Sequence, residues 1–168
     1  MLQRGGGGGG GRVSVTATGS FTYRGDYQTY GGRSQYEVGG SGTTFLSYPT
    51  EEGVKVETTL ILNNHGKQPR TEFVNDIAAD SARTYLIVSE LESFTRVRVL
   101  GGAHLAMKKR DDTVGDVSVT IGNLEGDNSG MIHSSKEMRL TVADGVDPFP
   151  TSLRVYDSSE MDLPPSKC

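Results

Sequence analysis

The sequence contains no tryptophan and only one cysteine, and both absences limit what the chain can be. Cys168 is the last residue and has no partner for a disulfide within the chain, so cysteine usage gives no sign of an oxidising compartment. Without tryptophan, a core has to be built from aliphatic residues, phenylalanine and tyrosine. The 168 residues suit one domain that buries a core without disulfides.

Long apolar runs are also absent. The chain has no stretch of about 18 apolar residues, so we expect no membrane-spanning helix. Residues 1–4 and the glycines that follow lack the apolar region of a signal peptide, and the localisation stays open. The net charge of −4 argues against nucleic-acid contact as the main task, because phosphate binding needs clustered cations.

Sequence signatures of catalysis are missing as well. The chain has no Gly-x-Ser-x-Gly nucleophile turn, no phosphate-binding loop, no His-Glu-x-x-His and no Cys-x-x-Cys. We therefore predict that the protein is not an enzyme and that it has no catalytic residues and no cofactor.

Candidate metal ligands are scattered along the chain. Calcium binds several oxygen ligands from loops, and two acidic loops raise that hypothesis, but the ligand spacing of an EF-hand is absent. We interpret the acidic residues as ordinary turns and the histidines as separate loop or surface residues, so no metal site is predicted. The acidic residues are Asp111, Asp112, Asp116, Glu125 and Asp127, and the histidines are His65, His104 and His133.

What the sequence does contain is a two-residue alternation of apolar and polar side chains. From Val13 to Tyr23 the odd positions are apolar or small, and the even positions are serine or threonine. Successive side chains of a strand point to opposite faces, so this pattern predicts a strand over 12–24 with one buried face. In the same way Val56 and Leu60 are expected on the buried face of a second strand. Further strands are predicted at 34–38, 43–48, 53–63, 83–89, 94–100, 104–108, 117–121, 138–142 and around 153–155.

Together these segments predict an all-β fold. About eight to ten short strands separated by turns are typical of an antiparallel β-sandwich, of the jelly-roll or Greek-key type. At most one short helix is expected, at 70–82, and 122–130 is interpreted as a polar loop. No repeat of fixed period is evident, so a propeller or a solenoid is not expected.

The ends of the chain differ in composition from its centre. Residues 1–11 contain seven consecutive glycines and are predicted to form a flexible arm. Residues 12–156 would form the β-sandwich domain, and 157–168 would form an acidic extended tail.

Three groups of residues could contact a partner. The first is the tripeptide Arg24, Gly25 and Asp26, a candidate receptor-binding turn at the end of the first strand. The second is a group of tyrosines that includes Tyr27, Tyr30 and Tyr36, because tyrosine supplies rigid amphipathic contact area. The third is a basic patch that would form if strands 94–100 and 103–109 paired, composed of Arg96, Arg98, Lys108, Lys109 and Arg110.

Two functions fit these observations. The first is a non-catalytic structural module that assembles with copies of itself or with other protein subunits. In layout alone, an arm before a β domain, the chain looks like coat, shell or decoration subunits of viral particles, which would place it in a virion. Only Arg4 and Arg12 are cationic in its arm, so genome contact is not expected. The alternative is an adhesin-like or glycan-binding module that uses the tyrosine-rich region 23–48.

Overall fold

The computed structural model describes residues 7–23, 25–33, 38–50, 53, 55–67, 83–135 and 137–143, together with the backbone of 153–156. These residues contain ten strands and no helix. The predicted helix at 70–82 lies outside the described residues. The strands are β1 (Arg12–Thr16), β2 (Thr43–Pro49), β3 (Val56–Asn63), β4 (Arg83–Val88), β5 (Glu92–Leu100), β6 (His104–Lys109), β7 (Val117–Gly126), β8 (Gly130–Ser134), β9 (Met138–Val142) and β10 (Leu153–Tyr156).

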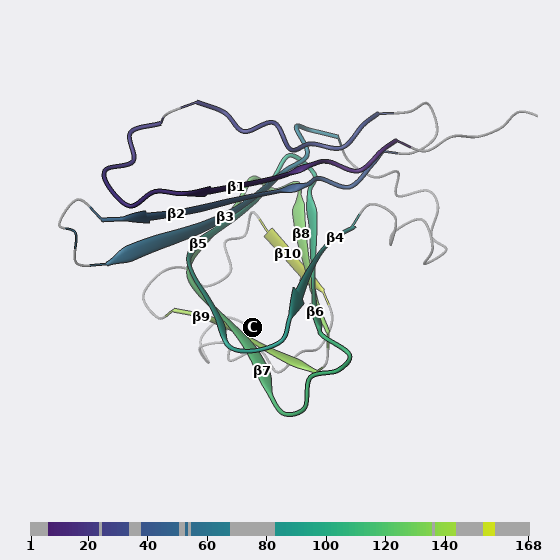
Figure 1. The fold of residues 1–168 in the computed structure, drawn as a ribbon. Helices are drawn as coiled ribbons and strands as arrows, with labels where there is room; N and C mark the ends of the chain where they lie inside the picture. Colours follow the sequence, from purple (N-terminus) through teal and green to yellow (C-terminus); the bar gives the residue numbers. More distant parts are fainter. Residues whose placement is uncertain are drawn as a thin grey trace, which may run out of the picture.

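The strands form two sheets, and most of the chain alternates between them. One sheet has six strands in the order β1-β2-β3-β5-β7-β9, and the other has four in the order β10-β8-β6-β4. From β3 onward, odd-numbered strands belong to the first sheet and even-numbered strands to the second. Figure 1 shows β4, β6 and β8 on the side of the molecule opposite β5, while β1, β2 and β3 extend away from them.

Strand direction contradicts the predicted antiparallel sandwich. Seven of the eight strand pairings are parallel, and β2 with β3 is the one antiparallel pair among these strands. Neither a jelly roll nor a Greek key has this topology, because both are built from antiparallel neighbours. As in an α/β sheet, parallel neighbours are joined by crossovers; from β3 onward each crossover contains a strand of the opposite sheet instead of a helix.

The resulting architecture is a short parallel β-solenoid, so the expectation that excluded a solenoid is also wrong. From β3 to β10, each coil contributes one strand to each sheet and stacks on the previous coil. The coils differ in length, and this difference conceals the repeat. Arg96 pairs with Asn123, 27 residues later, whereas Val117 pairs with Met138, 21 residues later.

The core lies between the two sheets and consists of rows of aliphatic side chains. Leu60, Val97 and Leu124 stand opposite one another on β3, β5 and β7, and all three are buried. On the second sheet, Leu105 pairs with Ile132, and both side chains are buried. Burial of each such side chain contributes about 1.5–3 kcal/mol.

The core does not extend to the first residues of β3. Val56, predicted on the buried face, has 63% of its surface exposed, whereas Leu60 is buried as predicted. Val56 pairs with Pro49 in the projecting β2–β3 pair, where none of the described strands of the second sheet lies opposite. Val13 and Phe21, from the first predicted strand, are half-buried. That strand ends at Thr16, and the chain then leaves the sheet.

One corner of the solenoid is built from stacked turns that need left-handed backbone. The residues with positive φ at this corner are His65, Gly66, Gly101, Gly102 and Asn128, which come from three successive coils. Such φ values favour glycine and asparagine, which explains the composition of the turns. Side chains join the turns of neighbouring coils. The Gly101 amide donates to Asp127 Oδ2 at 2.7 Å, and the Gly102 amide donates to Ser129 Oγ at 2.7 Å.

The glycine-rich segments pack against one another near β1 and β2. The Gly10 amide donates to the Gly40 carbonyl oxygen, and the Gly32 amide donates to that of Gly8. A Cβ placed on Gly39 would collide with the Gly8 carbonyl, so only glycine permits this approach. Residues 7–11 therefore have defined neighbours, and the flexibility predicted for 1–11 stays a prediction.

Candidate ligand-binding site

A cleft of about 770 Å³ lies where the chain after β1 passes over the outer face of β2 and β3. This volume falls within the roughly 300–1,000 Å³ that is usual for small-molecule sites. One wall is the segment 18–23, and the other is formed by the ends of the two strands and the turn between them. The residues that line it are Thr18, Gly19, Ser20, Phe21, Thr22, Tyr23, Leu46, Tyr48, Pro49, Thr50, Gly53 and Glu57.

Two aromatic rings stack on each other in this cleft and form an apolar block. Phe21 stacks on Tyr48 with 4.9 Å between ring centroids and 15° between ring planes. Tyr23 lies further along the same wall and packs at a tilt against Tyr27. The local sequence explains the arrangement: Phe21 and Tyr23 are two residues apart in an extended segment, and Tyr48 is at the end of β2.

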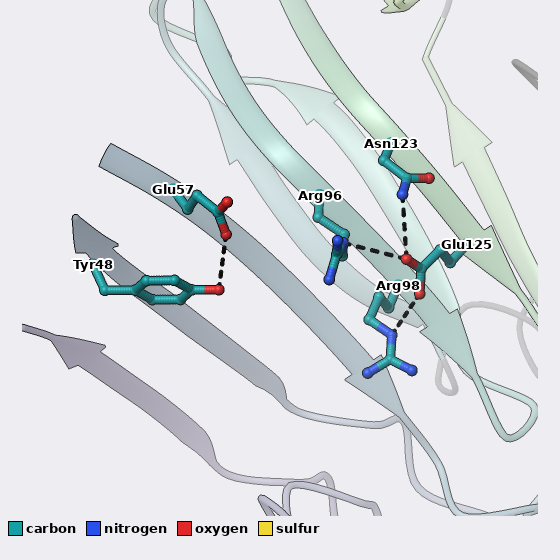
Figure 2. Close-up of polar contacts among 6 residues, drawn as sticks. All are labelled: Tyr48, Glu57, Arg96, Arg98, Asn123 and Glu125. Atoms are coloured by element: carbon teal, nitrogen blue, oxygen red, sulfur yellow. Dashed lines mark hydrogen bonds and ion pairs between the residues drawn. The ribbon is translucent and has the colours of Figure 1, made fainter. Parts of the chain in front are cut away.

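A carboxylate stands beside these rings. The Tyr48 hydroxyl donates a 2.9 Å hydrogen bond to Glu57 Oε2, across the paired positions of β2 and β3 (Figure 2). Burial raises the pKa of the Tyr48 hydroxyl, and its bond to Glu57 raises that pKa further. Tyr48 therefore stays protonated at neutral pH and fixes one carboxylate oxygen. Within the described residues, Oε1 of Glu57 makes no hydrogen bond and can accept one from a ligand.

The polar face continues from the cleft onto β5 and β7. Leu46, Thr59, Arg96 and Asn123 occupy matching positions on β2, β3, β5 and β7, on the side opposite the core. The next row includes Arg98 and Glu125, which are also paired. Strand spacing of about 4.8 Å puts Arg96 roughly 10 Å from Leu46 across the sheet.

Glu125 holds both arginines of this face. Arg98 Nε lies 2.8 Å from Glu125 Oε2, and Arg96 Nε lies 3.3 Å from Oε1, which also accepts a hydrogen bond from Asn123. Figure 2 shows the two terminal nitrogens of Arg98 directed away from Glu125. The arginine side chains are 47% and 40% exposed, for Arg96 and Arg98 respectively. Each guanidinium is thus oriented through Nε while its outer edge faces solvent.

The basic patch suggested by the sequence is divided between the two sheets. Arg96 and Arg98 are on β5, whereas Lys108 and Lys109 are on β6, and these strands do not pair. Lys108 and Arg110 form ion pairs with Asp111 and Asp112, and Lys109 donates to the Gly115 carbonyl, so these three cations contact their own loop.

The predicted tyrosines do not gather at one place. Tyr30 stacks on His65, and Lys67 Nζ lies 3.9 Å from the centre of the Tyr30 ring, so Tyr30 belongs to the corner turns. Tyr27 contacts Tyr23 at the edge of the cleft wall, and burial raises the pKa of the Tyr27 hydroxyl. Tyr36 lies outside the described residues.

The candidate receptor turn is described only in part, because Arg24 is outside the described residues. The other two residues fold around an aromatic ring: the Tyr23 hydroxyl donates to the Asp26 carbonyl oxygen, and a Cβ on Gly25 would collide with the Tyr23 ring. Nothing in this geometry tests receptor binding, which stays a prediction.

Two of the three histidines meet on the outer face of the second sheet. The rings of His104 on β6 and His133 on β8 have centroids 5.7 Å apart. Burial, together with the nearby His133 and Arg83, lowers the pKa of His104 to about 4. Across the part of the chain that the structure describes, no group of three or more histidine, cysteine, aspartate or glutamate side chains is arranged to hold a metal ion. Four of the acidic candidates contact protein groups instead: Asp111, Asp112, Glu125 and Asp127.

Sequence reasoning missed Glu57, Glu125 and Asn123 as members of this face. The alternation of Arg96 and Arg98 with buried valines did place the two arginines on an outer face, and burial confirms it. Glu125 fell in the segment interpreted as a polar loop, an interpretation that is wrong because β7 extends to Gly126.

Comparison with protein-family models, curated proteins and solved structures gives no match to this chain. Among the described residues, no helix is long and apolar enough to span a membrane. The predicted coat-like role depended on a sandwich layout, and the parallel sheets remove that basis.

Proposed function

We propose that this protein binds a saccharide in the cleft between segment 18–23 and the β2–β3 ends. The observation that carries the proposal is the stacked pair of Phe21 and Tyr48 beside the carboxylate of Glu57. A sugar ring has apolar C–H faces and a rim of hydroxyl groups. An aromatic surface next to a hydrogen-bond acceptor complements both parts.

Hydroxyl side chains around the cleft extend this complementarity. Thr18, Ser20, Thr22 and Thr50 line it, and each hydroxyl can donate and accept hydrogen bonds. A ligand made of hydroxyl groups on a carbon skeleton matches such a lining better than a purely apolar ligand would. This proposal is the alternative that the tyrosine-rich region 23–48 suggested, now with Phe21 and Glu57 included.

Saccharide titration with matched tyrosine variants tests the proposal. The full chain is titrated by calorimetry with a panel of neutral and acidic polysaccharides, and then Tyr48→Ala and Tyr85→Ala are compared. Tyr85 is a suitable control because it is a partly exposed tyrosine on β4 of the other sheet. We expect Tyr48→Ala to weaken binding roughly two- to tenfold, since aromatic contacts contribute roughly 0.5–1.5 kcal/mol.

Tyr85→Ala should leave the affinity unchanged. The proposal is contradicted if the unaltered protein binds no member of the panel. It is also contradicted if the Tyr48 and Tyr85 variants, both shown to be folded by circular dichroism, bind as tightly as the unaltered protein.

A further inference from the structure

The polar face beside the cleft has a feature that saccharide binding alone does not use. Arg96 and Arg98 stand two residues apart on β5, and both are held by one carboxylate, Glu125. One negative charge between two guanidinium groups leaves this trio with a charge of +1. The Glu125 oxygens form ion pairs with Arg96 and Arg98, and Oε1 also accepts a hydrogen bond from Asn123, so Glu125 acts as an anchor for the arginines.

The outer edges of the two guanidinium groups provide donors for an anion. Both arginines use Nε for Glu125, and the described residues provide no further partner for their terminal nitrogens. A guanidinium edge matches the paired oxygens of a carboxylate or a sulfate and binds them with two parallel hydrogen bonds. Orientation by Glu125 reduces the side-chain entropy that such binding would cost.

Arg96 and Arg98 lie close to the cleft, on the same face of the sheet. Thr59, two residues after Glu57 on β3, pairs with Arg96, so the arginines begin next to the cleft on the same face. Arg98 stands opposite Ile61, four residues after Glu57 and so roughly 13 Å along the strand. The carboxylate of Glu57 therefore repels an anion at the cleft end, whereas Arg98 attracts it at the far end.

We propose that Arg96 and Arg98 form a subsite for the carboxylate or sulfate group of an acidic saccharide. The inference rests on the proposed function and specifies its ligand: a chain of linked sugar rings that carries an anionic group. One ring would lie against the stacked pair of Phe21 and Tyr48, and the anionic group of a following ring would reach the arginines across β3.

Three probes and two arginine variants test this subsite. The probes are a polyuronate, the same polymer after reduction of its carboxylates to alcohols, and a sulfated polysaccharide. We expect at least one acidic polymer to bind tenfold or more tightly than the reduced polymer. Which acidic polymer binds decides between carboxylate and sulfate. The double variant R96Q/R98Q should remove that preference without weakening binding of the reduced polymer.

A matched control and a charge-conserving variant complete the design. Arg110 also contacts a carboxylate through Nε at 2.8 Å and is exposed, but it follows β6, a strand of the other sheet. R110Q should therefore keep the preference. R96K/R98K keeps both charges and loses the planar edge, so it should retain only part of the preference; it also gives a readout if R96Q/R98Q does not fold.

The outcomes separate this inference from the proposed function. Equal binding of acidic and reduced polymers, or an unchanged preference in both arginine variants, contradicts the anionic subsite while saccharide binding in the cleft stands. If the arginine variants lose binding but Tyr48→Ala does not, the anionic subsite stands and the cleft proposal fails. Binding of none of the polymers contradicts both.

Discussion

At the scale of single residues, the structure depends on side chains that close the corner turns. Asp127 is the clearest case, because it accepts from the Gly101 amide of one coil and from Ser129 of its own turn. Partial burial alone would raise the pKa of Asp127, but these hydrogen bonds outweigh burial and hold that pKa below its ordinary value. The ionised carboxylate therefore joins two neighbouring coils.

The variant Asp127→Asn tests this link. Because the folded-state pKa of Asp127 is lowered, its contribution to stability is present above the unfolded pKa of about 3.9 and is lost as the pH falls below that value. We expect Asp127→Asn to reduce the free energy of unfolding by about 1 kcal/mol at pH 7, a figure already reduced for solvent exposure. The variant should also flatten the pH dependence below pH 4 in urea unfolding. An unchanged unfolding free energy at pH 7 would show that the carboxylate does not join the coils.

At the scale of elements, the alternation of side chains predicted most strands but not how they pair. The predicted 43–48 and 138–142 agree closely with β2 and β9, and the alternation in 94–100 correctly separated Arg96 and Arg98 from the buried valines. Parallel and antiparallel neighbours both require side chains to alternate, so one strand does not reveal its partner's direction. The contact between Arg98 and Glu125 depends on that direction and on a coil of 27 residues, and it could not be predicted.

The stacking of β6 on β8 brings together two histidines that the sequence separates by 29 positions, His104 and His133. The pKa of His104, about 4, lies below the ordinary value of 6.5, so the unfolded chain binds more protons between these pH values. Stability should therefore be complete above pH 6.5 and fall as the pH drops towards 4. We expect a loss on the order of 2 kcal/mol.

Thermal unfolding followed by circular dichroism from pH 7 to pH 4 measures this effect. His104→Gln should largely remove the pH dependence in that window, whereas His65→Asn, at a corner turn with positive φ, should retain it. Parallel pH curves for the parent protein and His104→Gln would contradict the buried histidine contact.

At the scale of the whole molecule, stability comes from rows of side chains that continue from coil to coil. Ile121 is fully buried and pairs with Phe94 on one side and Val142 on the other, so it joins three strands of the larger sheet. A solenoid has no other core to compensate, because each coil is stabilised mainly by its neighbours.

Truncation of Ile121 tests how far the rows support the fold. Ile121→Ala should lower the free energy of unfolding by about 2–5 kcal/mol, through lost burial and the cavity that forms. Val114 is 99% exposed, and Val114→Ala should change stability by less than about 0.5 kcal/mol. Chemical denaturation measures the free energy of unfolding of both variants. Similar decreases in the two variants would mean that Ile121 is not in a continuous core.

If Tyr48, Glu57, Arg96 and Arg98, from three strands, form one ligand-binding face, then one ligand must affect all four residues. An NMR titration of the isotope-labelled full chain with an oligouronate measures this. We expect the resonances of these four residues to shift together with one dissociation constant, while those of His104 on the opposite sheet do not move. Absence of shifts at the four residues, or shifts centred on β6 and β8, would contradict it.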